Sequence, residues 1–196
     1  MLLFICCAGA YLAGSVNFSI VLFRALKKTD PRQAFSGNPG AFNVYRVHGF
    51  FWALAVLLLD VGRAMGVGLL AVALLPPAQV PVAGFGLILG NCFPCFHRYK
   101  GGKGVANFLG FYAILIPVYA LSGLAVWLAS YFISRVAFIG SILLVWLTAG
   151  GALVVYEFDP VATAGVTATA LLISICHRKN INEFVGKKYA PDETDR

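Results

Sequence analysis

Residues 105–133 read VANFLGFYAILIPVYALSGLAVWLASYFI, a stretch of 29 residues with no charged side chain and with Pro117 in its middle. A helix that crosses a bilayer needs about 20 predominantly apolar residues, so this stretch is longer than one crossing requires. Backbone groups in lipid must be satisfied within the segment, which leaves the α-helix as the expected structure. The stretch therefore predicts a helical membrane protein and raises the question of one crossing or two.

The composition of the whole chain gives the same fold class. Of 196 residues, 60% are hydrophobic and 12% are charged, and the mean hydropathy is +0.82. Soluble domains are about 45–50% apolar and about 25% charged, so a soluble fold, a coiled coil and a disordered chain are excluded. We expect an all-α polytopic integral membrane protein with a single domain over residues 1–196, whose residues 182–196 form a polar cytoplasmic tail.

Working outward from residues 105–133, five further apolar runs predict spans. They lie at residues 2–23, 50–75, 80–96, 136–156 and 161–176. The first run lacks the positive start of a cleavable signal peptide and is long enough to cross, so we expect it to stay as a span.

The Lys and Arg residues decide how often residues 105–133 cross. If the stretch crosses twice, every connector that carries Lys or Arg falls on one side, and the connectors at 76–79, Pro117 and 157–160 carry none. We therefore predict seven transmembrane helices, some short, with the N-terminus outside and the C-terminus in the cytoplasm. Two helices of about 14 residues reach only about 21 Å, which requires a thinned bilayer or a helix end inside the protein.

Three polar connectors then meet at the cytoplasmic face. They are SGNPGAFNVYR at residues 36–46, KGGKG at 100–104 and HRKN at 177–180. Glycine lets backbone amides approach an anion, and a helix start adds a positive end. Topology alone also puts basic residues there, but the joint pattern and the net charge of +7 favour a phosphorylated ligand.

Two polar features lie within the apolar runs. Asp60 and Arg63, spaced i and i+3, are expected to pair inside the bundle, either as a structural ion pair or in support of the site. Cys92 and Cys95, among five cysteines, form a lone CxxC motif. No second pair completes a zinc site, so we expect apolar packing and no metal.

These motifs resemble the bacterial acyl-phosphate:glycerol-3-phosphate acyltransferase (PlsY) family over the whole chain. The matching runs are GSVNF at residues 14–18, residues 36–46, FPCFHRYKGGKGVA at 93–106 and HRKNI at 177–181, with a weak serine-rich echo at Ser134 and Ser141. The chain departs from the family pattern at Asn91, where His is usual, at Arg63, where Lys is usual, and at Asn17, where Pro is common.

The resemblance implies an enzyme of the bacterial cytoplasmic (inner) membrane with its active site facing the cytoplasm. It would transfer a fatty acyl group from acyl phosphate to the 1-hydroxyl of sn-glycerol 3-phosphate. The products would be lysophosphatidic acid and phosphate, in the first committed step of phospholipid biosynthesis. No cofactor, metal or nucleic acid is expected, and the enzyme would act in the lipid bilayer as a monomer.

The residues of the three connectors take the roles that this reaction requires. We assign catalysis to Ser36, Arg46, Lys103, His177 and Asn180. Substrate and phosphate binding is assigned to the same five and to Gly37, Asn38, Gly40, Asn43, Gly101, Gly102, Gly104 and Ser141. His177 is the one candidate base of the third motif. The alternative, slightly favoured because no nearby acid except Glu183 is placed to fix the His177 tautomer, is that the donor phosphate takes the proton.

Two other classes remain as alternatives. A small anion or lipid transporter would also bind phosphate near broken helices, but it usually shows an internal repeat, and none is evident here. A membrane thiol oxidoreductase using Cys92 and Cys95 is disfavoured by the Phe-Pro between the two cysteines.

Overall fold

The computed structural model describes residues 1–189, with the side chains of residues 1–186, and in this range it contains helices and no strand. The α-helices are α1 (Leu2–Ser15), α2 (Phe18–Ala25), α3 (Ala41–His48), α4 (Phe50–Leu74), α5 (Val80–Cys92), α6 (Val105–Leu115), α7 (Pro117–Ser134), α8 (Ala137–Val155), α9 (Pro160–Cys176) and α10 (Arg178–Tyr189). Short 3-10 helices lie at Pro31–Gln33, Pro77–Gln79 and Cys95–His97. The predicted tail thus begins inside α10, and residues 190–196 lie outside the described residues.

Within the described residues, four helical segments are long and apolar enough to cross a membrane, and six are if each bent pair counts as one span. The predicted span at residues 2–23 consists of two helices, α1 and α2, which are long and apolar enough to cross when they are counted together. The chain bends by 40° between α1 and α2, where Val16 is extended and the Ile20 amide donates to Asn17 Oδ1 at 3.2 Å. Asn17, at the position where the resembled family often has Pro, therefore caps α2.

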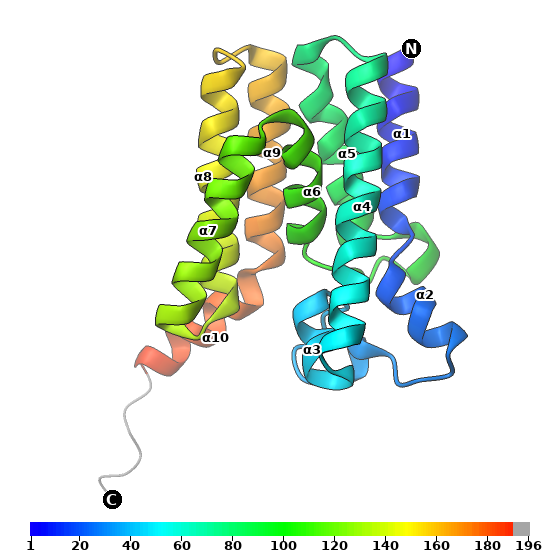
Figure 1. The fold of residues 1–196 in the computed structure, drawn as a ribbon, viewed down its shortest axis with the longest axis vertical. Coiled ribbons are helices and arrows are strands. Elements are labelled where there is room, and N and C mark those ends of the chain that lie inside the picture. Colours follow the sequence, from blue (N-terminus) through cyan, green and yellow to red (C-terminus); the bar gives the residue numbers. More distant parts are fainter. Residues whose placement is uncertain (190–196) are drawn as a thin grey trace, which may run out of the picture.

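The break in residues 105–133 is present, and it falls at the proline. Pro117 is the first residue of α7, where its missing amide removes no helical hydrogen bond. The two helices are unequal, since α6 has 11 residues and α7 has 18, in place of the expected 14 or so each. Ile116 at the corner is only 4% exposed, and the corner lies short of the ends of α8 and α9 (Figure 1). The short α6 therefore ends inside the protein.

The helices form a bundle in which α5 and α6 are central. Helix α5 packs on α1 and α9, α6 packs on α4, and α7 packs on α8. The core residues Leu87, Ile88, Phe108, Phe111 and Tyr112, all from α5 and α6, are fully buried. Because α5 faces protein on most sides, it anchors the connectors at its end.

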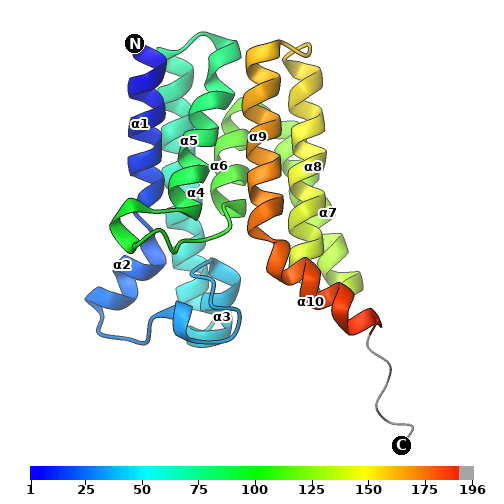
Figure 2. The same ribbon diagram turned by 180° about the vertical axis from the view of Figure 1, so that it is seen from behind.

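The connectors sort to opposite ends of the bundle. Helices α2, α3 and α10 and the connector at residues 93–104 lie at one end, whereas the N-terminus and the turns at 75–79 and 156–159 lie at the other (Figures 1 and 2). The predicted convergence of the three polar connectors on one end is thus observed.

Glycines bring α1 and α5 into backbone contact. A Cβ atom on Gly90 would lie 2.0 Å from the Tyr11 carbonyl oxygen, one on Gly14 would lie 2.1 Å from the Leu87 carbonyl oxygen, and one on Gly86 would lie 2.7 Å from the Cys7 carbonyl oxygen. These contacts are with backbone atoms, which no side-chain movement relieves. Only glycine at these positions permits the observed distance between the two helices.

We therefore expect Gly90→Ala to push α1 away from α5. Overpacking of this kind costs about 1–3 kcal/mol, so the thermal unfolding temperature of the detergent-solubilised protein should fall by several degrees. Gly66→Ala in α4 is the matched control, because nothing lies within 4 Å of its Cβ position, and its unfolding temperature should not fall. Equal unfolding temperatures for the two variants would contradict the close packing of α1 on α5.

Candidate active site

A polar cleft of about 290 Å³ lies at the end of the bundle where the connectors meet. It is lined by Phe35, Ser36, Arg46, Lys179, Asn180 and Glu183. Ser36 precedes α3 and Arg46 lies within it, while the last three residues lie on α10. The cleft therefore joins the first and the third of the predicted connectors, and it carries more positive than negative charge.

Asn43 fixes the loop before α3. Its Oδ1 accepts hydrogen bonds from the Ser36 amide at 3.3 Å and the Ser36 hydroxyl at 3.0 Å. Its Nδ2 donates to the carbonyl oxygens of Pro31 at 2.7 Å and Ala34 at 3.2 Å. Asn43 is buried and both ends of its amide are occupied, so it positions Ser36 from inside the loop.

Aromatic rings hold Arg46 in place. Its guanidinium lies 4.9 Å from the centre of the Phe42 ring, and Phe42 meets Tyr131 of α7 edge to face at 5.5 Å. Tyr131 stacks on Trp127, whose Nε1 donates to the Ser141 hydroxyl at 3.2 Å. The Ser141 hydroxyl in turn donates to the Ala137 carbonyl oxygen. Ser141 is therefore connected to Arg46 only through Trp127, Tyr131 and Phe42, and it does not line the cleft.

The glycines of residues 101–104 pack against the end of α5. The Gly101 amide donates to the Cys92 carbonyl oxygen at 3.2 Å and the Gly102 amide donates to the Asn91 carbonyl oxygen at 2.9 Å. A Cβ on Gly101 would lie 2.0 Å from the Asn91 carbonyl oxygen. In the first connector, the Gly37 amide likewise donates to Ala34. These three amides hold the loops together and are therefore not free to bind an anion.

Lys103 brings the second connector to the third. Its Nζ donates a hydrogen bond to Asn180 Oδ1. Burial lowers the pKa of Lys103, although Cys176 and Glu183 act to raise it, and the charge of Lys179 lowers it further. A bound anion would offset both the burial and the repulsion by Lys179.

Arg32, in the segment just before the first connector, links that segment to the second connector. Its Nη1 donates to the Lys100 carbonyl oxygen at 3.2 Å, and its Nη2 pairs with Asp30 Oδ2 at 2.6 Å. Partial burial acts to raise the pKa of Asp30, but the hydrogen bonds and charge of Arg32 outweigh it and leave that pKa below its ordinary value. All three connectors are thus linked.

His177 lies at the junction between α9 and α10 and is 3% exposed. Its Nδ1 lies 2.8 Å from the Ile173 carbonyl oxygen. Because a carbonyl only accepts, Nδ1 carries the proton and Nε2 is the acceptor. Burial lowers the pKa of His177 to about 4; the Ile173 hydrogen bond opposes this shift, and the Lys103 charge adds to it. The ring is therefore neutral near pH 7.

Asp60 and Arg63 form the expected ion pair within α4, with Arg63 Nη2 3.0 Å from Asp60 Oδ1. Arg63 also donates to Asn107 Oδ1 of α6 at 2.6 Å and to the Val16 carbonyl oxygen at the α1–α2 bend. Neither residue lines the cleft. The pair ties three parts of the bundle together.

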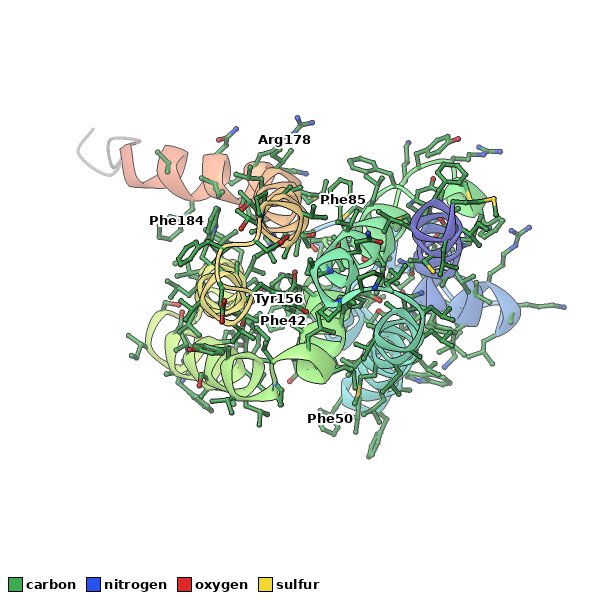
Figure 3. The ribbon with its side chains drawn as sticks, turned by 90° about the horizontal axis from the view of Figure 1, so that it is seen from above. Phe42, Phe50, Phe85, Tyr156, Arg178 and Phe184 are labelled. Atoms are coloured by element: carbon green, nitrogen blue, oxygen red, sulfur yellow. The ribbon has the colours of Figure 1, made fainter. Side chains whose placement is uncertain are left out.

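Three side chains of the cleft were not among the predicted site residues, namely Phe35, Lys179 and Glu183. Lys179 and Glu183 belong to the face of α10 that carries Asn180, a grouping that helical spacing from Asn180 could have indicated. Glu183 lies 3.8 Å from Lys179. The His177 tautomer is fixed by the Ile173 carbonyl and not by Glu183. Figure 3 shows Phe184 between α10 and α8, where it meets Phe138 at 5.7 Å.

Metal-binding side chains do not cluster in the described part of the chain, where no group of three or more His, Cys, Asp or Glu could hold an ion. Cys92 is buried, Cys95 is half-buried, and both are free thiols.

The sequence is similar to one family of known proteins. A sequence profile described as glycerol-3-phosphate acyltransferase matches residues 4–187. The glycerol-3-phosphate acyltransferase of Anaeromyxobacter dehalogenans (strain 2CP-C) is 42% identical over 187 residues, which cover 91% of each chain. That of Halalkalibacterium halodurans is 36% identical over 183 residues, covering 90% of this chain and 89% of the relative.

Solved structures give a matching fold. The glycerol 3-phosphate form of PlsY (YgiH), an integral membrane glycerol 3-phosphate acyltransferase, superposes with a TM-score of 0.87 at 30% identity, covering 98% of this chain and 96% of that chain. Its lysophosphatidic acid form gives a TM-score of 0.85 at 30% identity, over 94% and 92% of the two chains.

Proposed function

The chain belongs to the glycerol-3-phosphate acyltransferase family, and we propose that it uses acyl phosphate as its donor in the cleft between α3 and α10. It is an integral membrane acyltransferase that acts on glycerol 3-phosphate and forms lysophosphatidic acid. The observation that carries the proposal is the convergence of Ser36, Arg46 and Asn180 on one cleft, with Lys103 bound to Asn180.

The chemistry of the donor suits these residues. An acyl phosphate is a mixed anhydride with a good leaving group, so catalysis needs positioning and charge stabilisation more than a covalent nucleophile. The phosphate of the donor binds to Ser36, Arg46 and Lys103. The hydroxyl oxygen of glycerol 3-phosphate attacks the acyl carbon, the bond from that carbon to the phosphate oxygen breaks, and inorganic phosphate leaves. The positive charges of Arg46 and Lys103 stabilise the phosphate as it departs.

His177 and Asn180 orient glycerol 3-phosphate, and the donor phosphate takes the hydroxyl proton. A tautomer fixed by the Ile173 carbonyl gives Nε2 the geometry of an acceptor. However, a base whose pKa is about 4 is poorly matched to proton transfer near pH 7. The low pKa, more than the lack of an acidic partner, favours the orienting role.

The proposal extends to topology and assembly. The bent pair α1–α2 and the helices α4, α5, α6, α7, α8 and α9 make seven spans. The end that carries α2, α3 and α10 faces the cytoplasm, since the connectors rich in Lys and Arg lie there. The enzyme resides in the bacterial inner membrane and acts as a monomer.

The donor is tested directly with detergent-solubilised protein, palmitoyl phosphate and glycerol 3-phosphate. We expect phosphate release that depends on glycerol 3-phosphate, and no acyl transfer from palmitoyl-CoA. Lys103→Met should lower kcat by about 10²–10³-fold, as the loss of one preorganised donor typically does. Lys27→Met, a change at an exposed residue that does not line the cleft, should leave kcat unchanged.

Transfer from palmitoyl-CoA at an equal rate would contradict the choice of donor. Binding of glycerol 3-phosphate without turnover would favour a transporter.

His177→Gln and His177→Asn separate the two roles of the ring. An orienting hydrogen bond is worth about 0.5–1.5 kcal/mol, so kcat should fall by no more than about tenfold while KM for glycerol 3-phosphate rises. In the wild type, the lowered pKa keeps the ring neutral until the pH falls toward 4, and kcat should show no His177 titration between pH 6 and 8. Loss of kcat by about 10²–10⁴-fold, with binding intact, would identify His177 as the base.

Orientation is tested by labelling single cysteines in intact cells with an impermeant thiol reagent, after removal of the five native cysteines. Cysteine placed at Lys28 should be protected, and cysteine placed at Gln79 or Asp159 should react. Labelling at Lys28 with protection at Gln79 would reverse the proposed orientation.

A further inference from the structure

Among the described residues, the cleft is lined by one carboxylate, that of Glu183, to which the acyl transfer described above gives no role. Glu183 lies on α10, and its side chain is 58% exposed. Its Oε1 lies 3.8 Å from Lys179 Nζ, which is longer than a hydrogen bond of about 2.7–3.2 Å. Lys179 therefore balances the charge of the carboxylate without occupying its oxygens, which can accept hydrogen bonds from a ligand.

Glu183 extends the face of α10 that carries Asn180. The two residues are spaced i and i+3, and helical residues at this spacing are neighbours on one face. Asn180 lines the same cleft and accepts a hydrogen bond from Lys103. Three helical residues rise about 4.5 Å, so Glu183 lies about one turn beyond a residue that is proposed above to orient glycerol 3-phosphate.

The two cationic side chains of the cleft can only donate hydrogen bonds. Arg46 and Lys179 have no acceptor atom, which suits them to phosphate. Asn180 Oδ1 can accept, but it already does so from Lys103. A carboxylate accepts through both oxygens, and its charge makes these hydrogen bonds stronger than those to a neutral acceptor. Glu183 is thus the strongest acceptor among the described residues that line the cleft.

A carboxylate in a phosphate-binding cleft requires a physical reason, because it repels the phosphate groups of both substrates. Glycerol 3-phosphate has two hydroxyl groups. The 1-hydroxyl attacks the acyl carbon, whereas the 2-hydroxyl does not react and needs an acceptor while it is bound, since a desolvated donor without a partner is costly. A charge that repels every ligand except one that donates to it discriminates against the wrong ligand. The 2-hydroxyl supplies such a donor.

We propose that Glu183 accepts a hydrogen bond from the 2-hydroxyl of glycerol 3-phosphate and thereby selects acceptors that carry a hydroxyl beside the reacting one. This role rests on the proposed function, which places glycerol 3-phosphate in the cleft between α3 and α10. A site built to hydrogen-bond a substrate hydroxyl rejects an analogue that lacks it, because the polar group of the site then loses its partner. Glu183 acts on specificity, and acyl transfer itself still depends on the residues assigned above.

The role is tested with 3-hydroxypropyl phosphate, which keeps the phosphate and the reacting hydroxyl of glycerol 3-phosphate but lacks the 2-hydroxyl. Both acceptors are assayed with palmitoyl phosphate and the detergent-solubilised full-length protein. A hydrogen bond to a charged group favours the bonded ligand by about tenfold or more, and the exposure of Glu183 places it at the low end. Wild-type kcat/KM should therefore be about tenfold higher for glycerol 3-phosphate than for the analogue.

Matched variants separate the hydrogen bond from the charge. Glu183→Ala should reduce the ratio of the two kcat/KM values about tenfold, and Glu183→Gln, which keeps an acceptor oxygen without the charge, should give an intermediate ratio. Loss of the negative charge acts on the phosphate of both acceptors alike, so it cancels in the ratio. Glu157→Ala removes an exposed carboxylate at the opposite end of the bundle (Figure 1) and should keep the wild-type ratio.

The same contact is measured without turnover by calorimetric titration of each acceptor in the absence of donor. Glycerol 3-phosphate should bind about tenfold more tightly than the analogue to the wild type, and the two should bind Glu183→Ala with nearly equal affinity. A wild-type ratio near one, or a ratio that Glu183→Ala leaves unchanged, would overturn the role of Glu183. A wild type that binds glycerol 3-phosphate but transfers nothing from palmitoyl phosphate would instead overturn the proposed donor, and the binding comparison would still decide the role of Glu183.

Discussion

The guanidinium of Arg63, placed inside the apolar part of the bundle, is the charge around which the neighbouring helices are arranged. A charge in this setting is costly unless it is paired and its donors are used. Asp60, Asn107 and the Val16 carbonyl provide the partners. The last of these is a carbonyl at the bend between α1 and α2, so the arginine that needs partners also satisfies the backbone at that bend. The bend in turn lets the following connector run beneath the bundle toward the cleft.

The same rule governs the candidate active site. Asn43 and the Gly37 amide are engaged within the first connector, and the amides of Gly101 and Gly102 donate to carbonyl oxygens at the end of α5. Because these polar groups are satisfied within the protein, they hold the remaining side chains of the connectors in one geometry. Glycine therefore serves close packing here, and the polar side chains that line the cleft are those of Ser36, Arg46, Lys179, Asn180 and Glu183.

Burial makes the electrostatics of the site depend on its ligands. Lys103 and His177 both have lowered pKa values, and burial is the first cause in each case. A phosphate beside Lys103 would offset that burial, whereas His177 stays neutral. A neutral ring with its Nδ1 proton on a backbone carbonyl is suited to orienting a hydroxyl group, and a lysine that gains from a bound anion is suited to holding a phosphate.

Local patterns in the sequence were sufficient for the apolar runs, the break at Pro117, the Asp60–Arg63 pair and the meeting of three basic connectors at one end. Each depends on covalent geometry, helical spacing or the charge asymmetry of membrane connectors, all of which act over a few residues or along the chain. The Ile173 carbonyl lies one helical turn before His177, so helical spacing along the chain accounts for that contact too. The meeting of Phe35 with α10 in one cleft, the contact of Lys103 with Asn180 and the contact of Arg63 with the bend at Val16 were decided by tertiary packing, because each joins residues far apart in the sequence. The close approach of α1 to α5 was decided in the same way, since glycines of each helix meet backbone atoms of the other.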